Sequence, residues 1–200
     1  MKKTFLTLAL VAFSSAALLA QGISGGLKFG ANFANQNFDS DAFSISPDAR
    51  TSFHLGLFAT IMVSETFGVQ PELMYNSVGS KFDLGSLGDA VEKANYLTVP
   101  VMLRYQPVSV FNIHAGPTFG FLLSAESEYD GDSQDNKDAY KGLDLGLGIG
   151  AGIDLPFGLG FSARYVFGLS NVAEEDPNDP GTKVTNSVIQ ISATYKLFGK

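Results

Sequence analysis

The chain has 200 residues, with 20 Asp and Glu against 13 Lys and Arg, a formal net charge of −7, and no cysteine. This acidity argues against a nucleic-acid partner, because phosphates attract basic surfaces. The lack of cysteine excludes a disulfide scaffold and a lipid anchor on a cysteine after export.

The N-terminal segment has the order of a secretory signal. Lys2 and Lys3 precede an apolar run from Phe5 to Phe13, and a stretch of small residues ends at Ala20. We therefore predict a signal peptide over residues 1–20 and one domain over residues 21–200. No later segment is long and apolar enough for a membrane helix.

Eight stretches then alternate apolar residues with small or polar ones, most clearly in LDLGLGIGAGI at 143–153. Successive side chains of a strand point to opposite faces, so each stretch predicts a strand with one apolar face. The predicted strands are roughly 24–34, 52–63, 67–77, 95–105, 110–124, 142–154, 159–170 and 186–198. Short connections alternate with long polar ones near 35–51, 78–94, 125–141 and 171–185.

The charged residues within these strands all fall on the row opposite the apolar one. They are Lys28, Glu72, Arg104, Asp144, Asp154, Arg164 and Lys196. A charge on a lipid-facing row costs about 2–4 kcal/mol near the bilayer centre. A soluble calyx would need an apolar lumen instead. The pattern therefore predicts an all-β, eight-stranded antiparallel outer-membrane β-barrel with an apolar outside, a polar inside and long external loops.

The seven inward charges are predicted to form a structural polar network in the lumen. Eight strands leave an interior just wide enough for side chains, which favours a filled lumen over the alternative of a gated ion path. The glycine row from Gly146 to Gly152 further predicts a lopsided lumen. We expect bulky inward residues of strands two to four, such as Met102, to reach over these glycines.

Three prolines fall inside predicted strands, at Pro71, Pro100 and Pro117. A closed barrel has no edge strand to accommodate a residue without an N–H group. Each proline therefore requires either a bulge or a lost ladder bond.

Two inward histidines, His54 and His114, are candidates for metal binding or for a hydrolase site. The sequence shows no obvious serine partner, so we expect hydrogen-bonded core histidines. We predict no enzyme, and no catalytic, cofactor or metal site.

The loop around residues 126–135 is rich in the hard oxygen ligands that Ca²⁺ takes. A weak calcium site there would use Glu126, Glu128, Asp130 and Asp132. The alternative is a solvated acidic loop.

Several motifs resemble one family of membrane barrels. They are VQPELMYNS at 69–77 followed by Gly79, NYLTVPV at 95–101, AGP at 115–117, GLG at 146–148, and ARY at 163–165 with GLSN at 168–171. In this order they resemble the PorT-like outer-membrane β-barrel domain family. The resemblance implies an eight-stranded barrel in the outer membrane of a Gram-negative bacterium, without an assigned biochemical activity.

We expect a structural or surface-interaction role through the four long acidic loops. The expected partners are outer-membrane lipid and a surface or periplasmic protein. The alternatives are an outer-leaflet lipid-modifying enzyme and a component associated with a secretion system, since one branch of the PorT-like family is tied to secretion.

Overall fold

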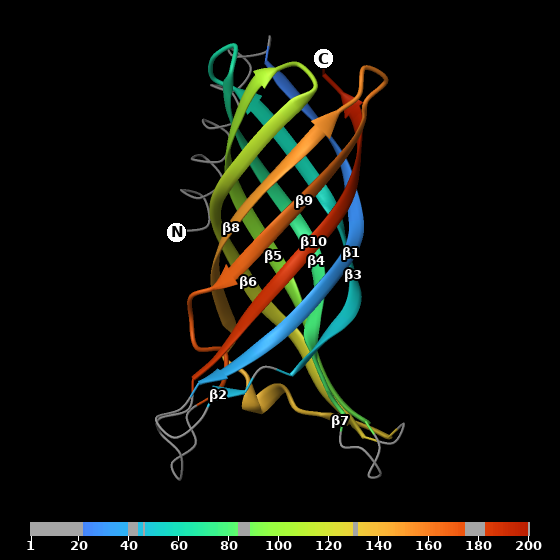
Figure 1. Cartoon of the computed structure of the whole chain (residues 1–200), viewed down its shortest axis with the longest axis vertical. Coiled ribbons are helices and arrows are strands. Elements are labelled where there is room, and N and C mark those ends of the chain that lie inside the picture. The colour runs from blue at the N-terminus through green and yellow to red at the C-terminus, as the bar shows by residue number, and fades with distance from the viewer. Residues whose placement is uncertain are drawn as a thin grey trace, which may run out of the picture.

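The computed structural model describes residues 22–39, 44–45, 47–83, 89–129, 132–174 and 183–199. Eight long antiparallel strands in this part of the chain close into a barrel (Figure 1). They are β1 (Ile23–Asp39), β3 (Asp48–Met62), β4 (Phe67–Asp83), β5 (Asp89–Val108), β6 (Phe111–Tyr129), β8 (Leu143–Asp154), β9 (Leu159–Gly168) and β10 (Lys183–Phe198). Outside this ring lie the short strands β2 (Ser44–Ile45) and β7 (Asp132–Asp135) and a 3₁₀ turn (Lys137–Ala139).

The ring closes because β1 pairs with both of its neighbours. Phe29 lies opposite Leu55 of β3 and opposite Ala193 of β10. Every other long strand pairs with the long strand before it and the one after it. The predicted all-β, eight-stranded antiparallel barrel is thereby confirmed.

The strands run further toward the long loops than the alternation predicts. β5 has 20 residues and β6 has 19, whereas about 9–11 residues are enough to cross a bilayer. The apolar alternation ends near Ala94, but the ladder continues with polar pairs such as Lys93 opposite Glu126. The short turns and the C-terminal end lie together at the opposite end of the barrel (top of Figure 1).

The three prolines interrupt the ladder without a bulge. The β3–β4 pairing stops after Phe58–Glu72 and resumes at Ile61–Val69, so Pro71 has no partner on β3, and the register is unchanged. The β5–β6 pairing likewise stops after Pro100–Thr118 and resumes at Leu103–Ala115, which leaves out Pro117. The β4–β5 pairing also skips from Pro71–Val101 to Met74–Thr98, which leaves Pro100 without a partner on β4. Each of the three prolines therefore loses its ladder position on one side, and the register is kept.

The outside of the barrel is apolar between the two ends. Phe29, Leu55 and Ile149 are 52%, 54% and 55% exposed, whereas the inward residues next to each of them in the chain are polar or glycine. None of the described helical segments is long and apolar enough to cross a membrane.

Candidate functional site

The centre of the lumen is organised around the carboxylate of Glu72. Arg164 binds it with two parallel contacts, Nη1 to Oε2 at 2.9 Å and Nη2 to Oε1 at 2.7 Å. Lys28 Nζ lies 3.1 Å and 3.2 Å from the same two oxygens. These side chains come from β4, β9 and β1, and each is at most 2% exposed. Charge-assisted contacts of this kind in a buried site fix the side-chain geometry.

A neutral amide joins this centre to a second ion pair. Gln70 donates from Nε2 to Glu72 Oε1 at 2.8 Å and accepts from Arg104 Nη1 at 3.0 Å. Arg104 Nη2 pairs with Asp154 of β8. Sequence reasoning missed Gln70, because a neutral residue gives no charge signal. Its inward position two residues before Glu72 was the available clue.

The structure thus brings five of the seven predicted network residues together, and it places the other two apart. Asp144 lies toward the loop end, where it accepts from Asn186 Nδ2 at 2.8 Å and Ser170 Oγ at 3.3 Å. Lys196 lies at the turn end, half-buried, and its ammonium has no hydrogen-bond or ion-pair partner among the described residues.

The glycine row faces large side chains, as the lopsided lumen predicts. A Cβ atom at Gly148 of β8 would lie 3.1 Å from Met102 Cε and 3.2 Å from Arg164 Cδ. Met102 is fully buried, and it reaches Gly148 from β5, two strands away in the ring. Close approach of side chains therefore explains a glycine at this position.

Between the Glu72 centre and the long loops, a cluster of apolar side chains fills the lumen. Buried apolar residues pack there with Leu122, Tyr140 and Val166, and the members of this outer cluster are Ala34, Val78, Ala94, Tyr96, Ala125 and Val188. The Tyr140 hydroxyl lies 3.4 Å from Gln36 Oε1 and 3.5 Å from Glu92 Oε2. Burial raises the pKa of Tyr140 to about 12, so at neutral pH its hydroxyl keeps the proton that it donates.

His54 does have a serine partner, contrary to the sequence-based interpretation. Its Nδ1 lies 2.7 Å from Asn32 Oδ1, and its Nε2 lies 2.9 Å from Ser192 Oγ. Asn32 Nδ2 donates to two backbone carbonyls, so its oxygen accepts from Nδ1–H of His54. Nε2 then accepts from the serine hydroxyl. Ser192 is separated from His54 by 138 positions in the chain, which hid this contact from sequence reasoning.

This arrangement resembles a nucleophile, a base and an orienting amide, but it is sealed. Ser192 is 2% exposed and His54 is 1% exposed. A substrate in lipid or in the outer leaflet has no route to a hydroxyl on the lumen side of the wall. The contacts join β1, β3 and β10 by buried hydrogen bonds. His114 is also buried, with Nδ1 3.1 Å from Asn112 Oδ1.

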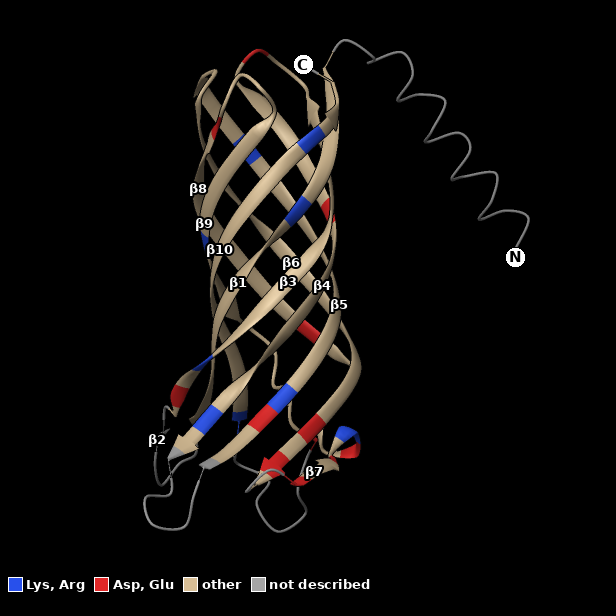
Figure 2. Ribbon diagram, turned by 90° about the vertical axis from the view of Figure 1, so that its right-hand side faces the viewer, with Lys and Arg blue, Asp and Glu red and all other residues tan. Residues whose placement is uncertain are grey.

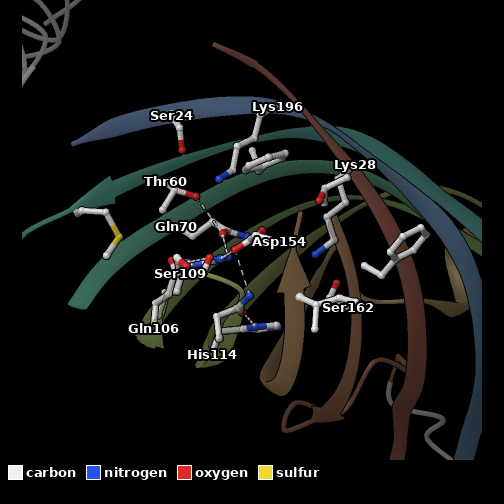
Figure 3. A pocket seen from close by; sticks show the side chains of 17 residues that line it. Ser24, Lys28, Thr60, Gln70, Gln106, Ser109, His114, Asp154, Ser162 and Lys196 are labelled. Carbon is white, nitrogen blue, oxygen red and sulfur yellow. Dashed lines mark hydrogen bonds and ion pairs between the residues drawn. The ribbon is translucent and has the colours of Figure 1, made fainter. Parts of the chain in front are cut away.

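Two separate cavities lie in the barrel, one on the short-turn side of the Glu72 centre and one on its loop side. One, of about 210 Å³, lies toward the short turns and is lined by Lys28, Arg104, Asp154 and Lys196 among others (Figure 3). The other, of about 50 Å³, lies toward the loops beside Tyr96 and Asp144. Glu72, Arg164 and Met102 lie within the barrel and line neither of these two cavities. In the described part of the chain, buried side chains therefore separate these two cavities at the level of the Glu72 centre.

The model of the outer membrane protein β-barrel domain matches residues 18–174 of the chain. The chain belongs to this family. With the closed ring and the apolar exterior, this places the protein in the outer membrane of a Gram-negative bacterium. In barrels of this class the short turns face the periplasm and the long loops face outward.

Solved structures share this fold at low sequence identity. Neisserial surface protein A is 13% identical with a TM-score of 0.56, and the match covers 88% of this chain and 99% of that one. The attachment invasion locus protein Ail of Yersinia pestis is 15% identical with a TM-score of 0.52 and the same two coverages. Ail has also been solved with the heparin analogue sucrose octasulfate. No curated protein sequence matches the chain.

Of the residues predicted for calcium, Glu126 and Glu128 lie at the end of β6, and Asp132 begins β7. Glu128 pairs with Lys93, and Glu126 accepts from Ser133 Oγ at 3.0 Å. Asp130 lies outside the described residues. The described part of the chain contains no group of three or more acidic or histidine residues placed to hold a metal.

Proposed function

We propose that this protein is a closed barrel that acts through its extracellular surface and binds partners with basic faces. The proposal rests on the separation of charge along the barrel. Residues 35–51, 78–94, 125–141 and 171–185 hold sixteen of the 20 acidic residues but six of the 13 basic ones, a formal charge of −10. In the described part of the chain, these charges gather at the loop ends of β4, β5 and β6 (Figure 2).

The filled lumen supports this proposal over a pore. The Glu72 centre and the outer cluster are two successive barriers between periplasm and medium. The long strands continue past the apolar band. Their polar outer ends therefore extend beyond the membrane, where they can contact a partner. We include membership of the PorT-like family, and with it a role beside a secretion system, as a finer proposal. It rests on the ordered motifs at 69–77, 95–101, 115–117, 146–148 and 163–171 alone.

An outer-leaflet lipid-modifying enzyme is the second candidate, because His54 contacts Ser192 and Asn32. The burial of all three side chains weighs against it. An assay of phospholipid and lipid A turnover with Ser192→Ala separates the two functions. The enzyme requires activity that this variant loses, whereas the surface role predicts no turnover by either protein.

Binding of charged probes tests the surface role. We expect the protein in neutral detergent to bind poly-L-lysine in a salt-dependent way and to bind sucrose octasulfate far less. Asp132→Asn combined with Asp138→Asn should weaken poly-L-lysine binding, whereas Glu65→Gln in a periplasmic turn should not. Equal binding of the two probes, or binding insensitive to salt, would contradict the proposal.

A further inference from the structure

The periplasmic half of the lumen holds more positive than negative side chains among its described residues. The cations are Lys28, Arg104, Arg164 and Lys196, and the carboxylates are Glu72 and Asp154. Because Lys28 and Arg164 share the single carboxylate of Glu72, these three side chains together carry one net positive charge. Arg104 and Asp154 balance each other, and Lys196, which has no carboxylate partner among the described residues, adds a second positive charge. This surplus lies inside a protein whose overall charge is negative.

The two surplus charges belong to one wall of the 210 Å³ cavity, called the vestibule below. Lys28 of β1 lies opposite Thr194 of β10 in the ladder, and Lys196 lies opposite Gly26, two positions before Lys28 in β1. Both ammonium groups point into the vestibule (Figure 3). Thr194 and Ser162, which also line it, add hydroxyl donors to the same wall.

The Lys28 ammonium has three N–H donors and one carboxylate partner, Glu72. The space is much larger than the ~10–15 Å³ that a single water needs. It is smaller than the roughly 300–1,000 Å³ of a site for a drug-sized ligand. A small solute therefore fits, whereas an oligosaccharide does not.

We propose that the vestibule binds a small oxyanion, a carboxylate or a phosphate, from the periplasm, with Lys196 and Lys28 as its cationic contacts. An uncompensated charge in a low-dielectric lumen is unfavourable, and an anion beside it removes this penalty. Ammonium groups hold phosphate as point charges, and hydroxyls satisfy the remaining oxygens. The entrance in this proposal is the periplasmic rim, where Gln106 near the end of β5 and Ser109 in the turn after it line the vestibule.

Calorimetric titration of the full chain in neutral detergent tests the site. Sodium phosphate and sodium acetate are the probes, at constant ionic strength set with chloride. We expect saturable binding of at least one probe, and Lys196→Gln should weaken it at least about tenfold. Thr194→Val should weaken it less, and Lys183→Gln at the loop end should leave it unchanged. A heat-modifiability gel checks that each variant folds.

Two results overturn the proposal: no saturable binding of either probe, or the same affinity in Lys196→Gln. A second measurement uses the absence of cysteine in the chain. Ser162→Cys should react faster with a negatively charged methanethiosulfonate than with a positively charged one, and the bound probe should slow this reaction. Faster reaction of the positive reagent would show that the vestibule does not attract anions.

Discussion

At the scale of single residues, Glu72 holds two cations that have no other carboxylate within hydrogen-bond distance among the described residues. Glu72→Ala should destabilise the barrel by about 3–5 kcal/mol, because removing one partner of a buried ion pair leaves the other uncompensated. Glu72→Gln should cost less, since the amide keeps an acceptor for Arg164. Urea unfolding in the presence of lipid measures both, with the exposed Glu65→Ala as control. Equal and small effects of the Glu72 variants would show that Glu72 is solvated.

Gly148 offers a separate test of lumen packing. Gly148→Leu would place its side chain against Met102 and Arg164 and should destabilise the barrel by about 1–3 kcal/mol. Gly142→Leu is the matched control, since a Cβ atom there meets nothing within 4 Å. Normal thermal stability of both variants would mean that the lumen beside Gly148 is open.

Residue alternation predicts which side chains face the lumen, and all seven predicted charges lie on the inward row. Alternation does not predict their pairing. Two inward residues meet only if they lie at the same height in the barrel, which depends on the register between strands far apart in the chain. For this reason Asp144 and Lys196 lie apart from Glu72, and the contact of Ser192 with His54 was missed.

At the scale of strands and loops, alternation locates the eight strands but not their outer ends. The alternation of apolar and polar residues ends where the strands leave the lipid. Beyond that point both faces of a strand can be polar, so the strand continues without an apolar row. The prolines show a similar limit. The sequence requires either a bulge or a lost bond at Pro71, and only the register shows that the bond is lost.

The segment around Tyr140 tests closure at the loop end. The backbone of Lys141 donates to Val172 O at 2.7 Å, and Tyr140 packs on the outer cluster. Tyr140→Ala should therefore open this segment, and trypsin should cleave after Lys137 or Lys141 roughly tenfold faster. Tyr140→Phe keeps the packing and should change the rate little. Unchanged cleavage in Tyr140→Ala would show that the outer cluster does not hold this segment.

At the scale of the whole molecule, charge and apolar surface are arranged along one axis. The apolar band crosses the membrane, the acidic loops face outward, and a surplus of positive charge lies in the periplasmic half of the lumen. The barrel and its orientation follow from the sequence pattern and the family. The positive surplus cannot be predicted in this way, because it depends on which cations each carboxylate contacts in the folded barrel.

Single-channel recording in planar bilayers tests the central claim, that the lumen is a closed core, most directly. Purified protein should give no stable unitary conductance, because the Glu72 centre and the outer cluster each block the lumen. Glu72→Ala combined with Tyr140→Ala removes part of both barriers and should produce brief openings. A large and stable conductance of the unmodified protein would contradict the closed core and indicate a pore.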